Sequence, residues 1–243
     1  MNDAGAAPEF APVAAANATE AAILSRRSVR GFLPTPIPRD VIEHVLDVAA
    51  RAPSGTNMQP WRVVALAGEE LRRFCDEVAA AFSSGAEPDG IERAYYPAPL
   101  HEPYRARRRK IGWDLYGHLG IARGEHEKAQ AHMVRNLHFF GAPVGLICTI
   151  DARLEIGSWL DYGMFLENIA VALRARDLDC CHMAVFAEFP RTVRTLLGIN
   201  AADAVVCGVA IGYADPQAPA NRLRTGRVAA AEFAAFRGWG ETP

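Results

Sequence analysis

The sequence predicts one domain of mixed helices and strands, either α/β or α+β. The chain has 243 residues, which is enough for one substantial hydrophobic core and does not require a second. Half of the residues are apolar and 22% are charged, as in globular proteins. Segments with helical periodicity alternate with short apolar runs that are typical of buried strands. Residues 1–17 are rich in Ala and Pro and predict a disordered tail before a single domain over 18–243.

Helices are predicted wherever apolar residues recur every three or four positions. In the clearest case Pro38 occupies a first helical position, and Ile42, Val45 and Ala49 follow on one face. A run of basic residues, 105–110, opens another of these segments, and either a solvated helix face or contact with an anionic cosubstrate would explain it. The predicted helices are 19–25, 38–51, 69–82, 105–119, 125–140, 159–175, 189–197 and 228–236.

Strands are predicted where β-branched and apolar residues run together without helical spacing. The segments 143–150 and 204–213 are apolar almost throughout, which indicates strands buried on both faces. The segment 61–66 ends before Gly68 and reads as a third strand, and 178–186 is either a short strand or a loop.

Charge and cysteine content limit the partners and the cellular compartment to expect. The net charge is −2, which gives no electrostatic reason to expect nucleic acid or an anionic membrane as a partner. The five cysteines are odd in number and lie mostly in apolar runs, which indicates reduced, buried thiols and a cytoplasmic protein. No apolar run approaches the roughly 20 residues that would span a bilayer.

The polar loop, defined here as residues 52–62, looks built to hold a polar, planar ligand. Pro53 and Pro60 restrain its ends, and Gly55 permits a tight bend. Its hydrogen-bonding side chains are more numerous than a plain connector would need, namely Ser54, Thr56, Asn57 and Gln59.

Two basic clusters and one long excursion stand out besides this loop. Arg26, Arg27, Ser28 and Arg30 form either a solvated basic turn or an anion cradle. A second small cluster occupies 221–224. The excursion over 83–104 is interrupted by glycines and prolines and predicts a functional loop or lid.

The sequence contains no motif for several common kinds of metal, redox, nucleotide or hydrolase site. His126 and His132 are six residues apart, whereas a helical zinc pair needs a spacing of four, so no metal site is expected. Cys180 and Cys181 are adjacent rather than spaced as a redox pair. No Gly-x-Gly-x-x-Gly, Walker or Gly-x-Ser-x-Gly motif is present.

Three motifs together resemble the FMN-dependent nitroreductase family, and the resemblance runs from Leu24 to Phe236. They are Arg-Arg-Ser-Val-Arg at 26–30, Pro-Ser-Gly-Thr-Asn-Met-Gln-Pro-Trp at 53–61, and Asn-Arg-Leu-Arg at 221–224 after a Gly-Tyr strand end. The segments 101–105 and 157–164 are similar to members that reduce nitrobenzoates and dinitroaniline-type nitroaromatics.

This resemblance implies an α+β fold with a mostly antiparallel sheet wrapped by helices, in an interlocked homodimer with FMN at the interface. It implies no metal. The backbone of Met183, Ala184 and Val185 would face the flavin ring, and either Ala184 or Val185 would supply the amide for N5, although Cys181–Met183 departs from the family pattern. The other cofactor residues would be Arg26, Arg27, Ser28, Arg30, Arg222 and Arg224 of one chain and Pro53, Ser54, Gly55, Asn57 and Gln59 of its partner.

The resemblance also implies a ping-pong reaction in which NAD(P)H reduces the flavin and a nitroaromatic compound reoxidises it, with the chemistry carried by the flavin rather than by a catalytic side chain. Aromatic residues of the excursion could wall the substrate space or could simply pack, and a substrate carboxylate or the NADPH phosphate could meet a nearby cation. The residues considered are Tyr95, Tyr96, His101, Tyr104, Arg105, Arg107 and Trp113.

Three alternatives remain open at this point. The same fold could act on quinones, activated alkenes or carbon–halogen bonds, because the flavin does not dictate its acceptor. The chain could bind flavin without turnover. It could also bind nucleic acid through 105–110, in which case its affinity would fall steeply with salt.

Overall fold

A four-stranded antiparallel sheet forms the centre of the computed structural model, which describes residues 13–83 and 92–239. Its strands are β1 (Arg62–Ala67), β2 (Val144–Asp151), β3 (Asp179–Met183) and β4 (Asp203–Gly212), in the spatial order β1-β2-β4-β3. Every neighbouring pair is antiparallel. The fold is therefore α+β, as the sequence resemblance implied, and the segment left open as strand or loop contains β3.

The two central strands are buried because both of their faces are covered. Every residue of β4 is buried, and β2 is buried up to its last residue, which explains their unbroken apolar sequences. A glycine is needed where an aromatic ring lies directly on the sheet: a Cβ on Gly208 would stand 2.4 Å from the Phe186 ring.

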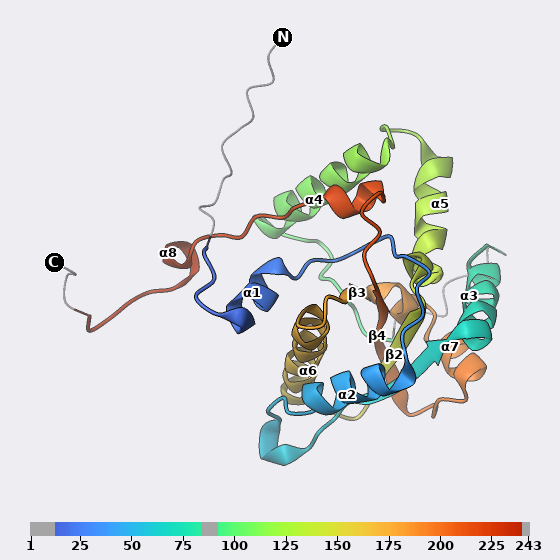
Figure 1. Cartoon of the computed structure of the whole chain (residues 1–243), viewed down its shortest axis with the longest axis horizontal. Coiled ribbons are helices and arrows are strands. Elements are labelled where there is room, and N and C mark those ends of the chain that lie inside the picture. Colours follow the sequence, from blue (N-terminus) through green and yellow to red (C-terminus); the bar gives the residue numbers. More distant parts are fainter. Residues whose placement is uncertain (1–12, 84–91, 240–243) are drawn as a thin grey trace, which may run out of the picture.

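Helices pack on both faces of this sheet (Figure 1). One core lies between the sheet and helices α2 (Arg39–Ala49) and α6 (Ile156–Arg174). The other core lies between the opposite face and helices α3 (Gly68–Ser83), α5 (His126–Leu137) and α7 (Pro190–Leu197). The helical periodicity of the sequence identifies the faces that these helices bury, as with Ile42, Val45 and Ala49 of α2.

Three further helices lie at the periphery. They are α1 (Ala18–Ser25), α4 (Tyr104–Leu119) and α8 (Ala230–Phe233). Helix α4 has no buried residue, so its expected apolar face does not enter a core of this chain. The short 3₁₀ helix η4 (Pro219–Arg222) lies beside α4. After η4 the chain leaves the body of the molecule (Figure 1), and Phe233, Phe236 and Trp239 in this last segment are exposed.

Most predicted boundaries agree with the structure to within three residues, and the differences have local causes. Pro38 precedes α2 as its cap, with a φ of −60° and an extended ψ, rather than occupying its first turn. The expected 125–140 helix ends at Leu137, because Phe139 and Phe140 adopt positive φ angles of 48° and 55° in a 3₁₀ turn. Part of the expected tail (1–12) and of the excursion (84–91) lies outside the described residues.

The sequence also led to expectations about the cysteines, membrane-spanning helices and metal sites. All five cysteines are free and buried. Among the residues that the structure describes, no helix is long and apolar enough to cross a membrane. Within the same residues, no cluster of His, Cys, Asp and Glu side chains is arranged to hold a metal ion.

Candidate cofactor site

The first basic cluster lies along β3 because its backbone pairs with that strand. Ser28 forms a parallel bridge with Cys180, and the Val29 N–H donates to the Cys180 carbonyl at 3.1 Å. Val29 is fully buried, which fixes the segment between Arg27 and Arg30. The arginines on either side are thereby held against one edge of the sheet.

Asn221 joins this segment to the second basic cluster. Its side-chain oxygen accepts from the Arg30 N–H at 2.8 Å, and its Nδ2 donates to the carbonyls of Gly31 at 2.7 Å and Asp215 at 2.9 Å. Gly31 is required at the contact, since a Cβ there would lie 2.4 Å from the Ala218 side chain. We call residues 26–30 and 221–224, joined in this way, the basic anchor.

The positive charge on the side chains of the basic anchor exceeds the negative charge of the neighbouring carboxylates. Burial lowers the pKa of the Arg27 guanidinium, the positive charges of Arg224 and Arg174 lower it further, and Asp179 opposes them. Arg174 already donates to Asp179 at 3.0 Å. The Nε of Arg27 is buried and has no hydrogen-bond partner. Arg27 as a whole is half-buried, so it is this one donor that is unsatisfied. An unsatisfied buried donor is costly, and a phosphate oxygen would satisfy it.

The remaining members of the anchor are placed around this point. Arg26 lies 3.7 Å from Glu167 of α6, and Arg30 donates from Nη1 to the Ser28 carbonyl at 3.3 Å. Arg222 and Arg224 are both exposed. The guanidinium of Arg224 donates to the carbonyls of Asn221 and Leu223 at 2.8 and 2.9 Å. The composition of the cluster and the unpartnered Nε of Arg27 favour the anion cradle over the solvated basic turn, and this role stays a prediction.

The flavin-facing segment implied by the resemblance follows directly on β3. Met183 ends that strand, and Ala184 and Val185 open the 3₁₀ helix η3 (Ala184–Glu188). Met183 and Val185 are buried, and Ala184 is half-buried. His182 precedes them with a buried Nε2 that lacks a hydrogen-bond partner, and burial lowers its pKa to about 4. This histidine is therefore neutral at pH 7.

The polar loop makes a tight turn, but the residues that allow the turn are not the expected Gly55. Gly55 does not adopt a left-handed conformation; Thr56, Asn57 and Gln59 do, with φ angles of 50°, 60° and 48°. Ser54 closes the turn: its carbonyl accepts from the Asn57 N–H at 2.9 Å and its Oγ from the Gln59 N–H at 3.0 Å. Left-handed residues other than glycine are disfavoured and gather at ligand sites.

Helix α6 holds the polar loop in place. The carboxylate of Asp161 accepts from the Gly55 N–H at 3.0 Å, and Tyr162 donates to the Arg62 carbonyl at 2.9 Å. The loop surrounds a shallow pocket of about 490 Å³ whose lining is mostly polar and includes Pro53, Ser54, Asn57 and Gln59. Asn221 belongs to the motif 221–224 and Asp161 to the segment 157–164, but the sequence does not reveal their supporting roles, because each binds a residue more than 100 positions away along the chain.

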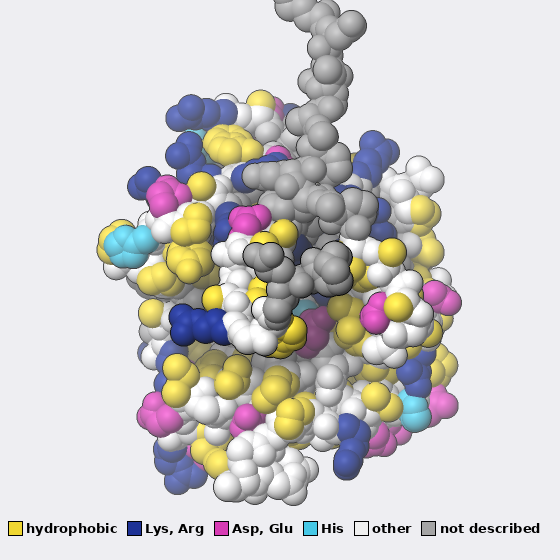
Figure 2. Space-filling view, turned by 90° about the vertical axis from the view of Figure 1, so that its left-hand side faces the viewer, with side chains coloured by type: hydrophobic (Ala, Val, Ile, Leu, Met, Phe, Trp, Pro, Cys, Tyr) yellow, Lys and Arg dark blue, Asp and Glu magenta, His cyan; other side chains and the backbone are white. Residues whose placement is uncertain are grey.

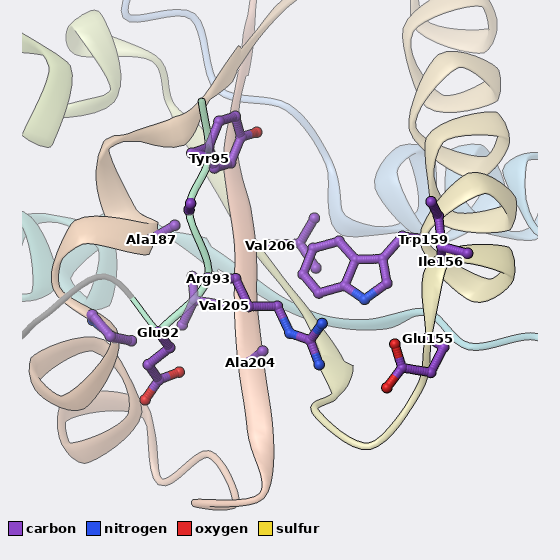
Figure 3. Close-up of a pocket in the computed structure, with 12 residues that line it drawn as sticks. Glu92, Arg93, Tyr95, Glu155, Ile156, Trp159, Ala187, Ala204, Val205 and Val206 are labelled. Atoms are coloured by element: carbon purple, nitrogen blue, oxygen red, sulfur yellow. The ribbon is translucent and has the colours of Figure 1, made fainter. Parts of the chain in front are cut away.

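The predicted substrate residues are spread rather than gathered. Tyr95 lines a second pocket of about 540 Å³ between β4 and Trp159 of α6 (Figure 3). Tyr95 is 47% exposed. Arg93, which the sequence did not single out, stacks over Trp159 at 5.4 Å from its ring centre and lies in the same pocket.

The other predicted substrate residues lie outside that pocket. Tyr96 contacts Arg108 of α4, whose guanidinium is 4.7 Å from its ring centre. Arg105 pairs with Glu102 at 2.7 Å. Tyr104 and Trp113 are exposed on α4, and His101 and Arg107 are exposed beside them. Their role in substrate binding stays a prediction.

Comparison with known proteins identifies relatives over nearly the whole chain. The model of the family described as "Nitroreductase family" matches residues 23–213. A 4-nitrobenzoate reductase from Pseudomonas putida is 39% identical over 220 residues, which are 90% of this chain and 96% of the relative. A chloronitrobenzene nitroreductase from Comamonas testosteroni is 37% identical and covers 88% of this chain and 94% of its own length.

A solved structure agrees in fold as well as in sequence. The FMN-dependent nitroreductase NfnB from Mycobacterium smegmatis, in complex with NADPH, superimposes with a TM-score of 0.86 at 29% identity. The match covers 90% of this chain and 97% of that chain. The overall fold of this chain is therefore one that is known from experiment.

Proposed function

Because the chain belongs to the nitroreductase family, we propose that it is an FMN-dependent NAD(P)H oxidoreductase that reduces the nitro group of aromatic compounds. The relatives above, which reduce nitrobenzoate or chloronitrobenzene, indicate the substrate class. The observation in this molecule that carries the proposal is the basic anchor, in which the buried Nε of Arg27 lacks a partner beside Arg224.

The residues of the anchor fit a flavin mononucleotide. Arg27 and Arg224 would hold its phosphate, with Arg26, Ser28 and Arg222 around them. Backbone N–H groups of Ala184 or Val185 would meet the ring at N5. When bound, FMN accepts hydride from NAD(P)H and passes two electrons at a time to the nitro group, which yields the nitroso compound and then the hydroxylamine.

Arg30 would supply the electrostatic contribution of the protein. It is half-buried, and its guanidinium donates to the Ser28 carbonyl at 3.3 Å in an exposed contact, so a bound flavin would be needed to exclude water from its charge. A cation beside the pyrimidine edge of the ring would stabilise the negative charge that the ring gains on reduction. Arg30→Ala should lower the reduction potential of the bound flavin, and an unchanged potential would contradict this role.

The proposal includes a homodimer, because one chain does not bring the polar loop to the basic anchor. Within residues 13–83 and 92–239, no hydrogen bond or ion pair joins 53–59 to 26–30 or 222–224, and the two lie apart in Figure 1. In a dimer, the loop of one chain would complete the anchor of the other.

The surface offers apolar residues for such an interface. Ile156 and Leu160 of α6 are 85% and 68% exposed, and Ile23 and Leu24 of α1 are exposed as well. Hydrophobic side chains are scattered over the face that carries α1 and α8 (Figure 2). Burying them between two copies would couple folding, dimerisation and cofactor binding. The buried free thiols support a cytoplasmic location.

The absorbance spectrum of the purified protein tests this function. We expect a flavin spectrum that is bleached by NADPH under anaerobic conditions and restored by 4-nitrobenzoate. Reoxidation that is faster with a quinone or an activated alkene than with any nitroaromatic compound would contradict the assignment of the acceptor. A colourless protein that binds no added FMN would contradict the assignment of the cofactor.

A further inference from the structure

We propose that Asp161 is a positioning residue for the cofactor: through the Gly55 N–H, it fixes the polar loop in the conformation that reaches the FMN of the partner subunit. The proposal rests on the proposed function, which makes FMN the ligand of this loop. Asp161 itself would touch neither cofactor nor substrate.

The contact between Asp161 and Gly55 is part-buried and charge-assisted, with the carboxylate on its buried side. The Gly55 N–H donates to Oδ2 at 3.0 Å, and Asp161 is only 8% exposed. In the part of the chain that the structure describes, no Lys or Arg pairs with this carboxylate. Burying a carboxylate is unfavourable unless its hydrogen bonds offset the loss of water, so the bond to Gly55 is the evident reason for an acid at this position.

The loop needs an external support because its own bonds do not attach it to the molecule. The bonds from Asn57 and Gln59 to Ser54 close the turn upon itself. Three non-glycine residues of the loop stay in the left-handed region, which they would leave if the turn were free to relax. The Gly55 N–H immediately precedes these residues, so its anchorage determines where the strained turn lies.

The ends of the loop are fixed by the same helix. Asn168 donates to the carbonyl of Ala49, the last residue of α2 three positions before the loop, at 3.2 Å. At its end, the Trp61 ring stacks on Phe165 with ring centres 4.8 Å apart, and Tyr162 binds the Arg62 carbonyl. Asp161 is thus the support for the middle of a loop whose two ends α6 already holds.

Helix α6 also carries the apolar residues proposed for the dimer interface. Leu160, next to Asp161 in sequence, is 68% exposed, and Ile156 lies one turn earlier. A helix that both contacts the partner and holds the loop would transfer the geometry of the interface directly to the loop. This explains why the support comes from α6 rather than from a neighbouring loop.

Titration of the dimeric apoprotein with FMN, followed by flavin fluorescence, tests the proposal. Asp161→Ala should raise the Kd for FMN by about 10-fold or more, the effect of losing one hydrogen bond to a charged group. Asp161→Asn keeps an acceptor oxygen and should stay within about threefold of the wild type. An unchanged Kd in Asp161→Ala, or an equal loss in both variants, would overturn the positioning role.

Ile169→Val is the matched control, because Ile169 is fully buried on the same helix but faces the core. It should lower the melting temperature of the apoprotein without changing the Kd for FMN. If it raises the Kd as much as Asp161→Ala does, the effect is one of general stability, and the proposal fails.

A measurement on the wild type covers the case in which Asp161→Ala does not fold. The Gly55 amide should exchange its hydrogen slowly in the apoprotein, and exchange at the rate of a free amide would overturn the proposal. A wild-type protein that binds no FMN would overturn the proposed function and this proposal together. Tight binding that Asp161→Ala leaves unchanged would overturn the positioning role alone.

Discussion

The basic anchor and the polar loop are both polar, but they are supported in opposite ways. In the anchor the backbone is satisfied by β3 and by Asn221, while cationic side chains such as Arg27 keep unmet hydrogen-bonding capacity. In the loop the side chains are mostly exposed, and it is the backbone that is constrained, by left-handed residues and by Asp161.

This difference indicates a division of labour. The anchor supplies charge, which suits a phosphate, and a phosphate can be gripped by side chains that still move. The loop supplies a fixed array of backbone groups, which suits the edge of a planar ring. Disturbing the anchor should therefore change electrostatics and affinity, and disturbing the loop should change geometry. The following predictions test that contrast.

Asn221→Ala should have the largest effect on stability. The substitution leaves the Arg30 N–H and the carbonyls of Gly31 and Asp215 without their side-chain partner, at a cost of about 3 kcal/mol in the free energy of unfolding. Urea denaturation of the apoprotein measures this. Asn200→Ala is the control, since Asn200 is exposed and accepts one bond from Ala202, and it should cost much less. Equal losses would show that Asn221 does not hold the anchor together.

Arg27→Met should change the stability of the apoprotein and the affinity for FMN in opposite directions. Removing Arg27 removes the cost of burying part of its charge and its repulsion with Arg224, which together outweigh its attraction to Asp179, so the apoprotein should melt at a higher temperature. The loss of one charged contact to the phosphate should raise the Kd for FMN by about 30- to 100-fold. Arg153→Met, at an exposed ion pair with Asp151, should change neither quantity appreciably. A fall in both stability and affinity would contradict the anion-cradle interpretation.

His182→Gln should reduce the loss of folding stability at acid pH. Burial, and to a lesser extent Arg26, lowers the pKa of folded His182 to about 4. Below pH 6.5 the unfolded chain gains a proton that the folded chain does not, so stability is complete above that pH and falls toward pH 4. At pH 5 the loss is on the order of 2 kcal/mol, and the variant should lack it. Identical pH profiles of melting temperature would contradict the prediction.

Thr56→Asn should have the smallest effect, because it changes the conformational cost of the loop and otherwise removes only the exposed bond from Thr56 Oγ1 to the Gly55 carbonyl. Asn tolerates the left-handed region better than a β-branched residue does, so the variant should gain about 0.5–1 kcal/mol in the free energy of unfolding. The Kd for FMN should stay within about twofold, because the backbone is unchanged. A less stable variant would indicate that the left-handed conformation of Thr56 is not a source of strain.

The sequence predicts the elements that obey local rules. Helix α2 follows from the spacing of Ile42, Val45 and Ala49, and β2 and β4 follow from unbroken apolar runs between two covered faces. The residue types of the anchor and the loop likewise indicate an anion site and a polar site, because arginines and amides carry that chemistry in any fold.

The remainder depends on contacts between distant segments. The exposed α4 is a strong helix by spacing alone, yet Trp113 stays half-exposed because no described part of this chain buries it. The left-handed backbone at Thr56, where glycine would be usual, directly follows Gly55, whose N–H is held by Asp161. Asp161 and Asn221 are ordinary polar residues until folding brings them to Gly55 and Gly31.

The most direct test of the account asks whether one cofactor site is built from two chains. One chain carries Arg27→Met, the other carries Gly55→Pro, and distinct affinity tags allow the mixed dimer to be purified. Both homodimers should bind FMN weakly, because every site has one defective half. In the mixed dimer one site combines two intact halves, so we predict one tightly bound FMN per dimer. A mixed dimer without any tight site, or a stable monomer saturated with FMN, would contradict the account.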